Sequence, residues 1–204
     1  MARIPLLADR GAGWLTRTLV FRAMSRRYGE VPEPIRAAAH HPGILWASAV
    51  HELGVERAAR RLPAELRDLV VHRVATVVGC SWCVDFGTML TLRAGFSVDR
   101  HRQLDQYGES PLFTDDERLA LEYADAMTAQ PMTVTDQLVE RLRERLDDGQ
   151  LVELTYMISL ENMRARTNQA LGVTEQGYTS GDVCPVPVDE QITRARTTQK
   201  PMKL

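Results

Sequence analysis

The sequence contains, at residues 79–86, the stretch Gly79-Cys80-Ser81-Trp82-Cys83-Val84-Asp85-Phe86. It follows a mostly apolar run, residues 69–78, that has the spacing of a helix, and it opens a second helical pattern through Met89 and Leu92. If Gly79 breaks the backbone between the two helices, both cysteine sulfurs lie in the first turn of the second helix. The unpaired amide groups and the positive dipole end of that turn favour a thiolate, the reactive form of cysteine.

The rest of the chain also predicts helices. Thr114, with Glu117 three positions later, has the pattern of a capping box, and Asp147 or Asp148 is expected to cap the last long helix. No segment has the pattern of a strand, so the predicted fold class is all-α. Apolar spacing predicts helices over residues 13–28, 43–61, 63–78, 80–95, 98–107, 114–130, 135–146 and 150–171.

The chain has 204 residues, of which 44% are apolar, and this length fits one domain more naturally than two. We expect an N-terminal helical arm at residues 1–41 and a helical core at residues 42–176. Residues 177–204 contain three prolines and no apolar period, which predicts an extended C-terminal tail.

The overall charge is close to balanced, with a formal net charge of −2 and an isoelectric point near 6.2. This balance argues against nucleic acid or an anionic membrane as a partner. The sequence has no apolar run of about 18 residues and no signal peptide pattern, so we expect a soluble cytoplasmic protein without a membrane span.

The three cysteines are too few for a secreted disulfide scaffold. In a reducing compartment a CxxC pair is more often catalytic or metal-binding than structural. A zinc site would need a second Cys/His pair at short spacing, but His40 and His41 are adjacent and Cys184 is isolated. We therefore predict no metal site, and the absence of a glycine-rich phosphate loop predicts no nucleotide or flavin cofactor.

Three blocks of the sequence together resemble a known family. Residues 62–75 read Leu-Pro-x-x-Leu-Arg-Asp-Leu-Val-Val-x-Arg-Val-Ala, and residues 79–86 follow with the CxxC. Residues 151–155, with Asn-Met-x-x-Arg-x-Asn-x-x-Leu-Gly at 162–172, are similar to the family's C-terminal helix. This pattern resembles the alkyl hydroperoxidase D (AhpD)-like, carboxymuconolactone decarboxylase superfamily over about residues 42–173. The resemblance implies a helical bundle that forms a homo-oligomer, with active sites near the subunit interfaces.

The resemblance also implies roles for individual residues. Cys83 would be the peroxidatic thiol that attacks a hydroperoxide, and Cys80 the more exposed thiol that resolves the sulfenic acid to a disulfide. A family glutamate in the proton relay falls on Asp68, a shorter acid. The family's principal histidine, four residues after the second cysteine, falls on Gly87, so the imidazole expected there is missing.

Proton removal from Cys83 must then depend on the helix dipole, on Asp68 through water, or on another base. His72 is the candidate, because it lies four residues after Asp68 on the same helical face; the alternative is a core or interface histidine.

Three residues within or just after the CxxC are predicted to contact the substrate. Trp82 replaces a second family histidine and is expected to form a pocket wall or to pack in the core. Asp85 is a second acid near the thiols or a solvated residue of the first helical turn. Phe86 is the third predicted substrate contact.

We thus predict a peroxiredoxin-type, thiol-dependent peroxidase or disulfide reductase that acts on a small hydroperoxide. An external dithiol or a thiol reductant protein would regenerate it, and no cofactor is expected. One alternative is a binding or redox-sensing protein on a scaffold whose catalysis was lost with the histidine at position 87. A less favoured alternative is a cofactor-free lactone decarboxylase, for which paired thiols would be unnecessary.

Overall fold

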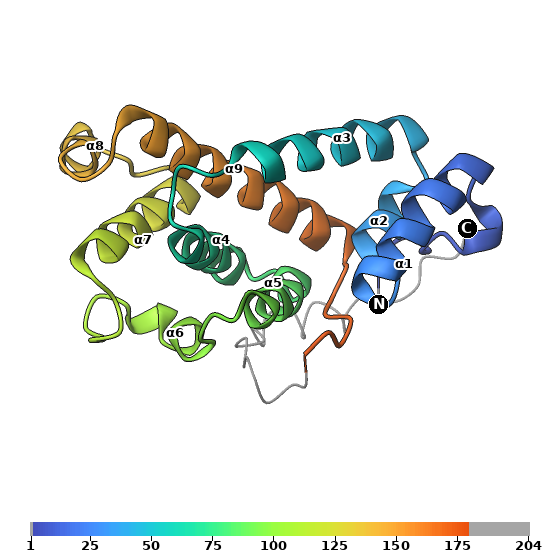
Figure 1. The fold of residues 1–204 in the computed structure, drawn as a ribbon, viewed down its shortest axis with the longest axis horizontal. Helices are drawn as coiled ribbons and strands as arrows, with labels where there is room; N and C mark the ends of the chain where they lie inside the picture. The colour runs from blue at the N-terminus through green and yellow to red at the C-terminus, as the bar shows by residue number, and fades with distance from the viewer. Residues whose placement is uncertain (1, 180–204) are drawn as a thin grey trace.

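The computed structural model describes residues 2–179 of the chain. Every regular element within these residues is helical, so the predicted all-α class is confirmed (Figure 1). Most of the predicted C-terminal tail, including Cys184, lies outside the described residues.

The helices follow one another with short connections. The N-terminal part holds a π-helical turn at Thr16–Phe21 that continues directly into α1, and two short 3-10 turns lie at Asp9–Gly11 and Leu104–Gln106. The α-helices are α1 (Arg22–Tyr28), α2 (Glu33–Ala38), α3 (Pro42–Ala58), α4 (Ala64–Val78), α5 (Ser81–Ala94), α6 (Asp99–Arg102), α7 (Asp115–Thr128), α8 (Asp136–Arg143) and α9 (Asp148–Leu171).

Helix α4 is the centre of the core. It packs against α5, α7 and α9, which surround it in Figure 1. Leu69, Val70 and Val74 on α4 are almost completely buried and belong to one cluster with Leu121 of α7 and Ile158 of α9. Burial of one such side chain contributes about 1.5–3 kcal/mol, so this cluster fixes the position of α4 and of the residues on its other face.

The turn between α4 and α5 is set by Gly79, which has φ 78° in the left-handed region. The N–H groups of Gly79 and Cys80 close the end of α4 by donating to Thr76 O at 3.0 Å and Ala75 O at 2.9 Å. A residue with a Cβ is strained in this conformation. The predicted break at Gly79 is therefore confirmed, and α5 begins at Ser81.

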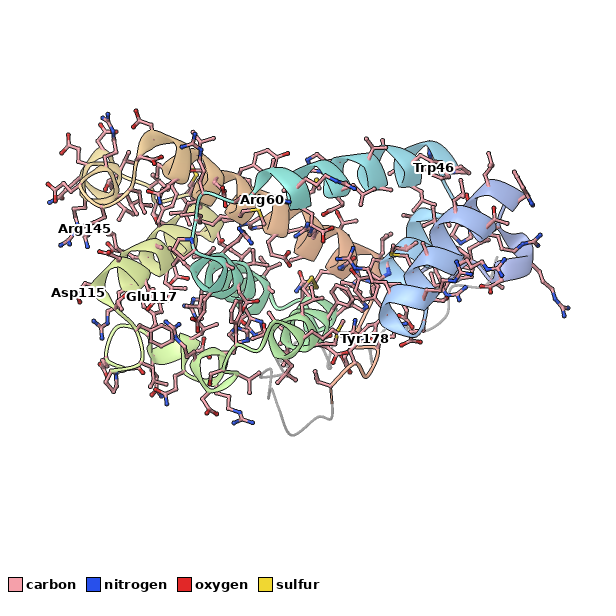
Figure 2. All side chains as sticks on the ribbon, in the orientation of Figure 1. Trp46, Arg60, Asp115, Glu117, Arg145 and Tyr178 are labelled. Carbon is pink, nitrogen blue, oxygen red and sulfur yellow. A yellow bond between two sulfur atoms is a disulfide. The ribbon has the colours of Figure 1, made fainter. Side chains whose placement is uncertain are left out.

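Side-chain caps fix the start of α7 and the start of α9. Thr114 and Glu117 form the predicted capping box of α7. Asp147 caps α9, with Gln150 as its reciprocal partner. The charged residues Asp115, Glu117 and Arg145 lie at the same end of the molecule, around the start of α7 and the end of α8 (Figure 2).

The sequence does not predict helix α2, because Pro32 and Pro34 are typical of a break after the first helix. The first helical segment ends at Tyr28, as predicted, and Gly29 follows it with φ 91°. Pro32 is instead the N-cap of α2 and Pro34 lies in its first turn, where a missing N–H costs nothing.

Helix α3 is apolar, yet little of its surface is covered by the rest of the chain. Of its 17 residues only Leu45 is buried, while Ile44, Val50 and Leu53 are 58%, 68% and 46% exposed. It runs from Trp46, near the N-terminal helices, toward Arg60 beside α9 (Figure 2). Within residues 2–179, no helix combines the length and hydropathy needed to cross a bilayer.

Candidate active site

Cys80 and Cys83 are joined by a disulfide at the start of α5. Cys80 is the N-cap residue, and its Sγ accepts a hydrogen bond from the Cys83 N–H at 3.2 Å. The predicted placement of both sulfurs in the first turn is confirmed. Partial positive charge at this end of α5 stabilises negative charge on either sulfur when the bond is reduced.

Both sulfur-bearing residues are buried, but not equally. Cys80 is 1% exposed and Cys83 is 8% exposed, so the expectation that Cys80 is the more exposed cysteine is wrong for this chain. The reason is the position of α9: Gln169 donates from Nε2 to Gly79 O at 3.2 Å and closes the turn that carries Cys80. Ala165 of α9 belongs to the same buried cluster.

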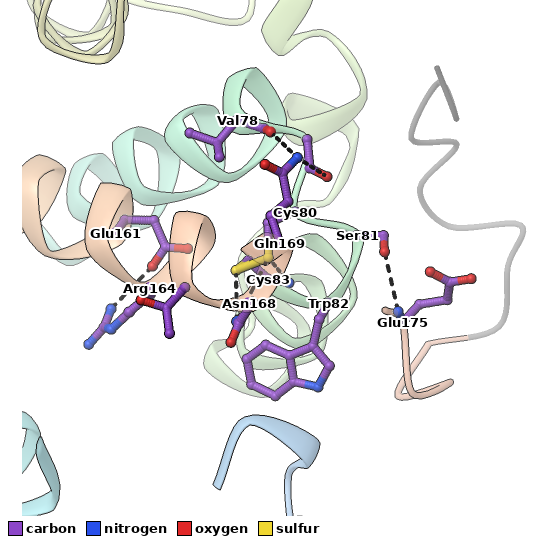
Figure 3. Close-up of a disulfide and its surroundings, with 12 residues drawn as sticks. Val78, Cys80, Ser81, Trp82, Cys83, Glu161, Arg164, Asn168, Gln169 and Glu175 are labelled. Atoms are coloured by element: carbon purple, nitrogen blue, oxygen red, sulfur yellow. Dashed lines mark hydrogen bonds and ion pairs between the residues drawn. A yellow bond between two sulfur atoms is a disulfide. The ribbon is translucent and has the colours of Figure 1, made fainter. Parts of the chain in front are cut away.

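Asn168 of α9 lies against the disulfide. Its Nδ2 is 3.4 Å from Cys83 Sγ and 3.8 Å from Cys80 Sγ, as Figure 3 shows. The side-chain amide is a donor at both sulfurs, and a donor stabilises a thiolate more than a thiol. Sequence reasoning noted Asn168 in the C-terminal motif of the family but gave it no role.

Asp68 pairs with a histidine that sequence reasoning did not select. Nε2 of His101, on α6, lies 2.8 Å from Asp68 Oδ2. Thr91 of α5 donates to the same carboxylate at 2.9 Å. The predicted acid is therefore held between α4, α5 and α6, and its side chain retains 21% exposure to solvent.

His72 stacks on His101, with ring centroids 3.8 Å apart and an angle of 22° between the rings. Burial lowers the pKa of His72 well below its ordinary value, and the charge of His101 lowers it further. In the disulfide form His72 is therefore neutral near pH 7. His101 thus contacts both Asp68 and His72, which lie one turn apart on α4.

The aromatic residues of the CxxC region form one cluster. Trp82 stacks on Phe86 with centroids 4.6 Å apart, and Tyr178 meets the edge of the Phe86 ring at 5.2 Å. Trp82 Nε1 also donates to Gln176 Oε1 at 3.1 Å. Trp82 is thus packed under the C-terminal part of the described chain, and contact of Trp82 and Phe86 with a substrate stays a prediction.

Asp85 anchors residues 175–179, which we name the strap. Its carboxylate accepts backbone N–H bonds from Gln176, Gly177, Tyr178 and Thr179 at 2.9–3.1 Å, and the Thr179 hydroxyl donates to it at 2.8 Å. The strap also contacts the CxxC directly, because Glu175 N donates to Ser81 Oγ at 3.3 Å (Figure 3). Asp85 is buried rather than solvated, and its predicted contact with a substrate stays a prediction.

A buried acid also lies on α9, two turns before Asn168. Burial raises the pKa of Glu161 to about 7 despite its ion pair with Arg164 at 3.3 Å. Arg164 also pairs with Glu52 of α3, so it ties α3 to α9 within one chain.

A cavity of about 470 Å³ lies between α7 and α8, away from the cysteines. Its walls include Glu122, Asp125 and Arg141, and none of the predicted site residues lines it. In residues 2–179, no group of three or more His, Cys, Asp or Glu side chains is placed to hold a metal ion.

Comparison with known proteins places this arrangement in a family. No family model matches the sequence. The uncharacterized protein YnjA of Escherichia coli is 37% identical over 187 residues, which are 92% of this chain and 95% of YnjA. An Agrobacterium tumefaciens protein of unknown function, described as a candidate antioxidant defence protein AhpD, is 25% identical; the match covers 68% of this chain and 94% of that one, with a TM-score of 0.63.

A third similar protein is the debrominase Bmp8, in a single-substitution variant bound to 2,3,4-tribromopyrrole. The match covers 96% of this chain and 99% of that one, with a TM-score of 0.72 and 17% identity, so it shows a shared fold alone. These similarities agree with the helical core and the CxxC disulfide described above. The chain belongs to the family of YnjA, within the AhpD-like superfamily of alkyl hydroperoxidase-type proteins.

Proposed function

We propose that this protein is a dithiol peroxidase that reduces a small hydroperoxide. The observation that carries the proposal is the bonded Cys80–Cys83 pair at the N-terminus of α5, with the Asn168 amide beside both sulfurs. The Cys83 thiolate attacks one peroxide oxygen, the O–O bond breaks, and the alcohol leaves with a proton. The Cys80 thiol then attacks the Cys83 sulfenic acid, water leaves, and the disulfide forms.

The completed cycle needs two electrons from outside the chain. An external dithiol, or a reductant protein that carries one, attacks the disulfide through a mixed disulfide and restores both thiols. No bound cofactor is required in this scheme. Such a cycle fits a reducing compartment such as the cytoplasm, where a dithiol donor is maintained.

The test follows thiols and intact mass while the reduced protein is titrated with cumene hydroperoxide and with hydrogen peroxide. Loss of two thiols with a mass decrease of about 2 Da supports the proposal, and Cys80→Ser should trap a sulfenic acid on Cys83. Cys83→Ser is the matched control and should retain its Cys80 thiol. Survival of both wild-type thiols through hours of excess peroxide would overturn the peroxidase assignment.

The same titration includes an arm without peroxide, because the fold alone does not decide the reaction. Bmp8, which shares the fold, is a debrominase. Bromide release from a bromopyrrole by the reduced protein, with inert thiols in the peroxide arm, would point to dehalogenation instead. If the reduced protein reacted neither with peroxide nor with the bromopyrrole, the CxxC would be better explained as a redox sensor or a core element.

We also propose that the protein is a homo-oligomer. The support is α3, whose apolar residues Ile44, Val50 and Leu53 are exposed in the single chain. Val152 and Tyr156 on the neighbouring face of α9 are exposed as well, and Tyr156 is hydrogen-bonded to His51 of α3. A second copy packed on these two helices would bury this apolar surface.

A further inference from the structure

We propose that His72 is the general base for Cys83 and that His101, held by Asp68, positions it. The inference rests on the proposed peroxidase function and deepens it by naming the group that moves the proton. It assigns a catalytic role to a side chain of α4, although α5 itself carries no imidazole.

Helices α4 and α5 leave the turn at Gly79 in opposite directions, and their facing residues follow in order along the pair. Far from this turn, the carboxylate of Asp68 on α4 accepts a hydrogen bond from Thr91 of α5. One turn closer to the cysteines, His72 of α4 faces Gly87 of α5. His72 therefore lies between the acid and the CxxC.

The His72 side chain of α4 lies in the space beside Gly87. A Cβ built on Gly87 would lie 3.4 Å from His72 Nδ1. Position 87 is four residues after Cys83, and helical residues at this spacing lie on one face with Cβ atoms about 5–6 Å apart. The His72 ring thus lies beside position 87, which is one helical turn from Cys83 along α5. Gly87 leaves room for an imidazole that comes from α4.

The His72 ring is held by its histidine neighbour. His101 stacks on His72, and its Nε2 is fixed by the Asp68 carboxylate at 2.8 Å. Nδ1 of His101 is buried and makes no hydrogen bond within the described residues. The position of His101 therefore depends on the Asp68 contact and on the stack. Any shift of His101 is transmitted to His72, which makes His101 a positioning residue.

In the proposed step the His72 ring both takes up and returns the proton. His72 takes the proton from the Cys83 thiol, and the thiolate then attacks the peroxide. As the O–O bond breaks, the imidazolium returns this proton to the leaving alkoxide. A thiolate at Cys83 favours the imidazolium by charge attraction, which offsets part of the effect of burial on the ring.

The test measures iodoacetamide alkylation of Cys83 as a function of pH in a Cys80→Ser background. This readout needs no peroxide, so it distinguishes failure of the base assignment from failure of the peroxidase proposal. Adding His72→Gln should lower the alkylation rate at pH 7 by about tenfold or more and move the profile to higher pH. His40→Gln, on the exposed surface, is the matched control and should leave the profile unchanged.

Two further variants separate the base from the residue that positions it. His72→Ala combined with Gly87→His moves the imidazole from α4 to α5 and should recover most of the lost rate. His101→Phe keeps an aromatic ring for the stack but loses the Asp68 bond, so it should shift the profile in the same direction by less. A folded His72→Gln protein, checked by circular dichroism, with an unchanged pH profile would overturn the base assignment. An unchanged His101→Phe profile would overturn the positioning role.

Discussion

The side-chain amide of Asn168 lies 3.4 Å from the sulfur of Cys83, although 85 residues separate them in sequence. The contact brings a donor from the last helix to the first turn of α5, where the helix dipole already favours negative charge. We therefore expect Asn168 to affect the reactivity of the thiols as well as the packing of α9 on α5.

We expect Asn168→Leu to raise the pKa of the Cys83 thiol by about one unit, because a hydrogen bond to a charged group contributes about 1.5–3 kcal/mol. Asn168→Asp should raise it further through repulsion of the thiolate. Thiolate absorbance near 240 nm against pH measures both changes in the reduced Cys80→Ser protein. Asn162→Leu, on the same helix but bonded to Thr128, is the control; an equal shift in this variant would mean that the effect is not local.

Release of the strap should open the disulfide to reductants. Asp85→Ala removes the acceptor for five hydrogen bonds from residues 176–179. We expect dithiothreitol to reduce Cys80–Cys83 about tenfold faster or more, since even one lost charged hydrogen bond accounts for that factor. Stopped-flow tryptophan fluorescence, to which Trp82 contributes together with Trp14 and Trp46, and thiol trapping both follow the reaction. Asp99→Ala, a surface acid, should not change the rate, and an unchanged rate in a folded Asp85→Ala protein would contradict the role of the strap.

Glu161 should make stability depend on pH. Burial raises its pKa from 4.5 to about 7 in the folded protein, so the folded state binds its proton more tightly than the unfolded state. The stability linked to this proton is present below about pH 4.5 and is lost as pH rises toward 7. Glu161→Gln should therefore become more stable than wild type by up to about 3 kcal/mol as pH rises through this window. Urea unfolding at pH 4.5 and 7.5 measures the difference, and a parallel response of both proteins would contradict it.

The exposed face of α3 should determine the association state. The double substitution Val50→Asp and Leu53→Asp places two charges on the apolar surface proposed for a second copy. We expect dissociation to a monomer, or a dissociation constant raised by at least about tenfold, because charge burial is costly. Sedimentation velocity gives the mass of the particle. Met132→Asp, which is 64% exposed and lies outside α3, is the control; an equal effect there would argue against an α3 interface.

The sequence predicted the helical fold well where local chemistry decides the structure. Thr114 and Asp147 start helices because their side chains bond nearby N–H groups, and Gly79 ends one because its backbone turns left-handed. Local signals were less clear at Pro32, since proline both ends helices and begins them. The short helix α2 was missed for this reason.

The site was predicted less completely because its remaining parts depend on long-range packing. His101 lies on a four-residue helix with no strong period, and only the folded chain brings it to Asp68. Asp85 has the position of a first-turn acid, yet its partners are more than 90 residues away. Two signals were available in retrospect: the histidine in the α6 segment, and the glycine at position 87 opposite His72.

The strap has a consequence for the order of events during synthesis. Its last described residue, Thr179, can bond to Asp85 only after the 94 residues that follow Asp85 have been synthesised. Until then α5 can form, but its cysteine pair lacks both the cover of residues 175–179 and the contact with Asn168. A growing chain therefore passes through a stage in which its thiols can react with disulfides in the surrounding solution, and folding of the strap onto α5 ends that stage.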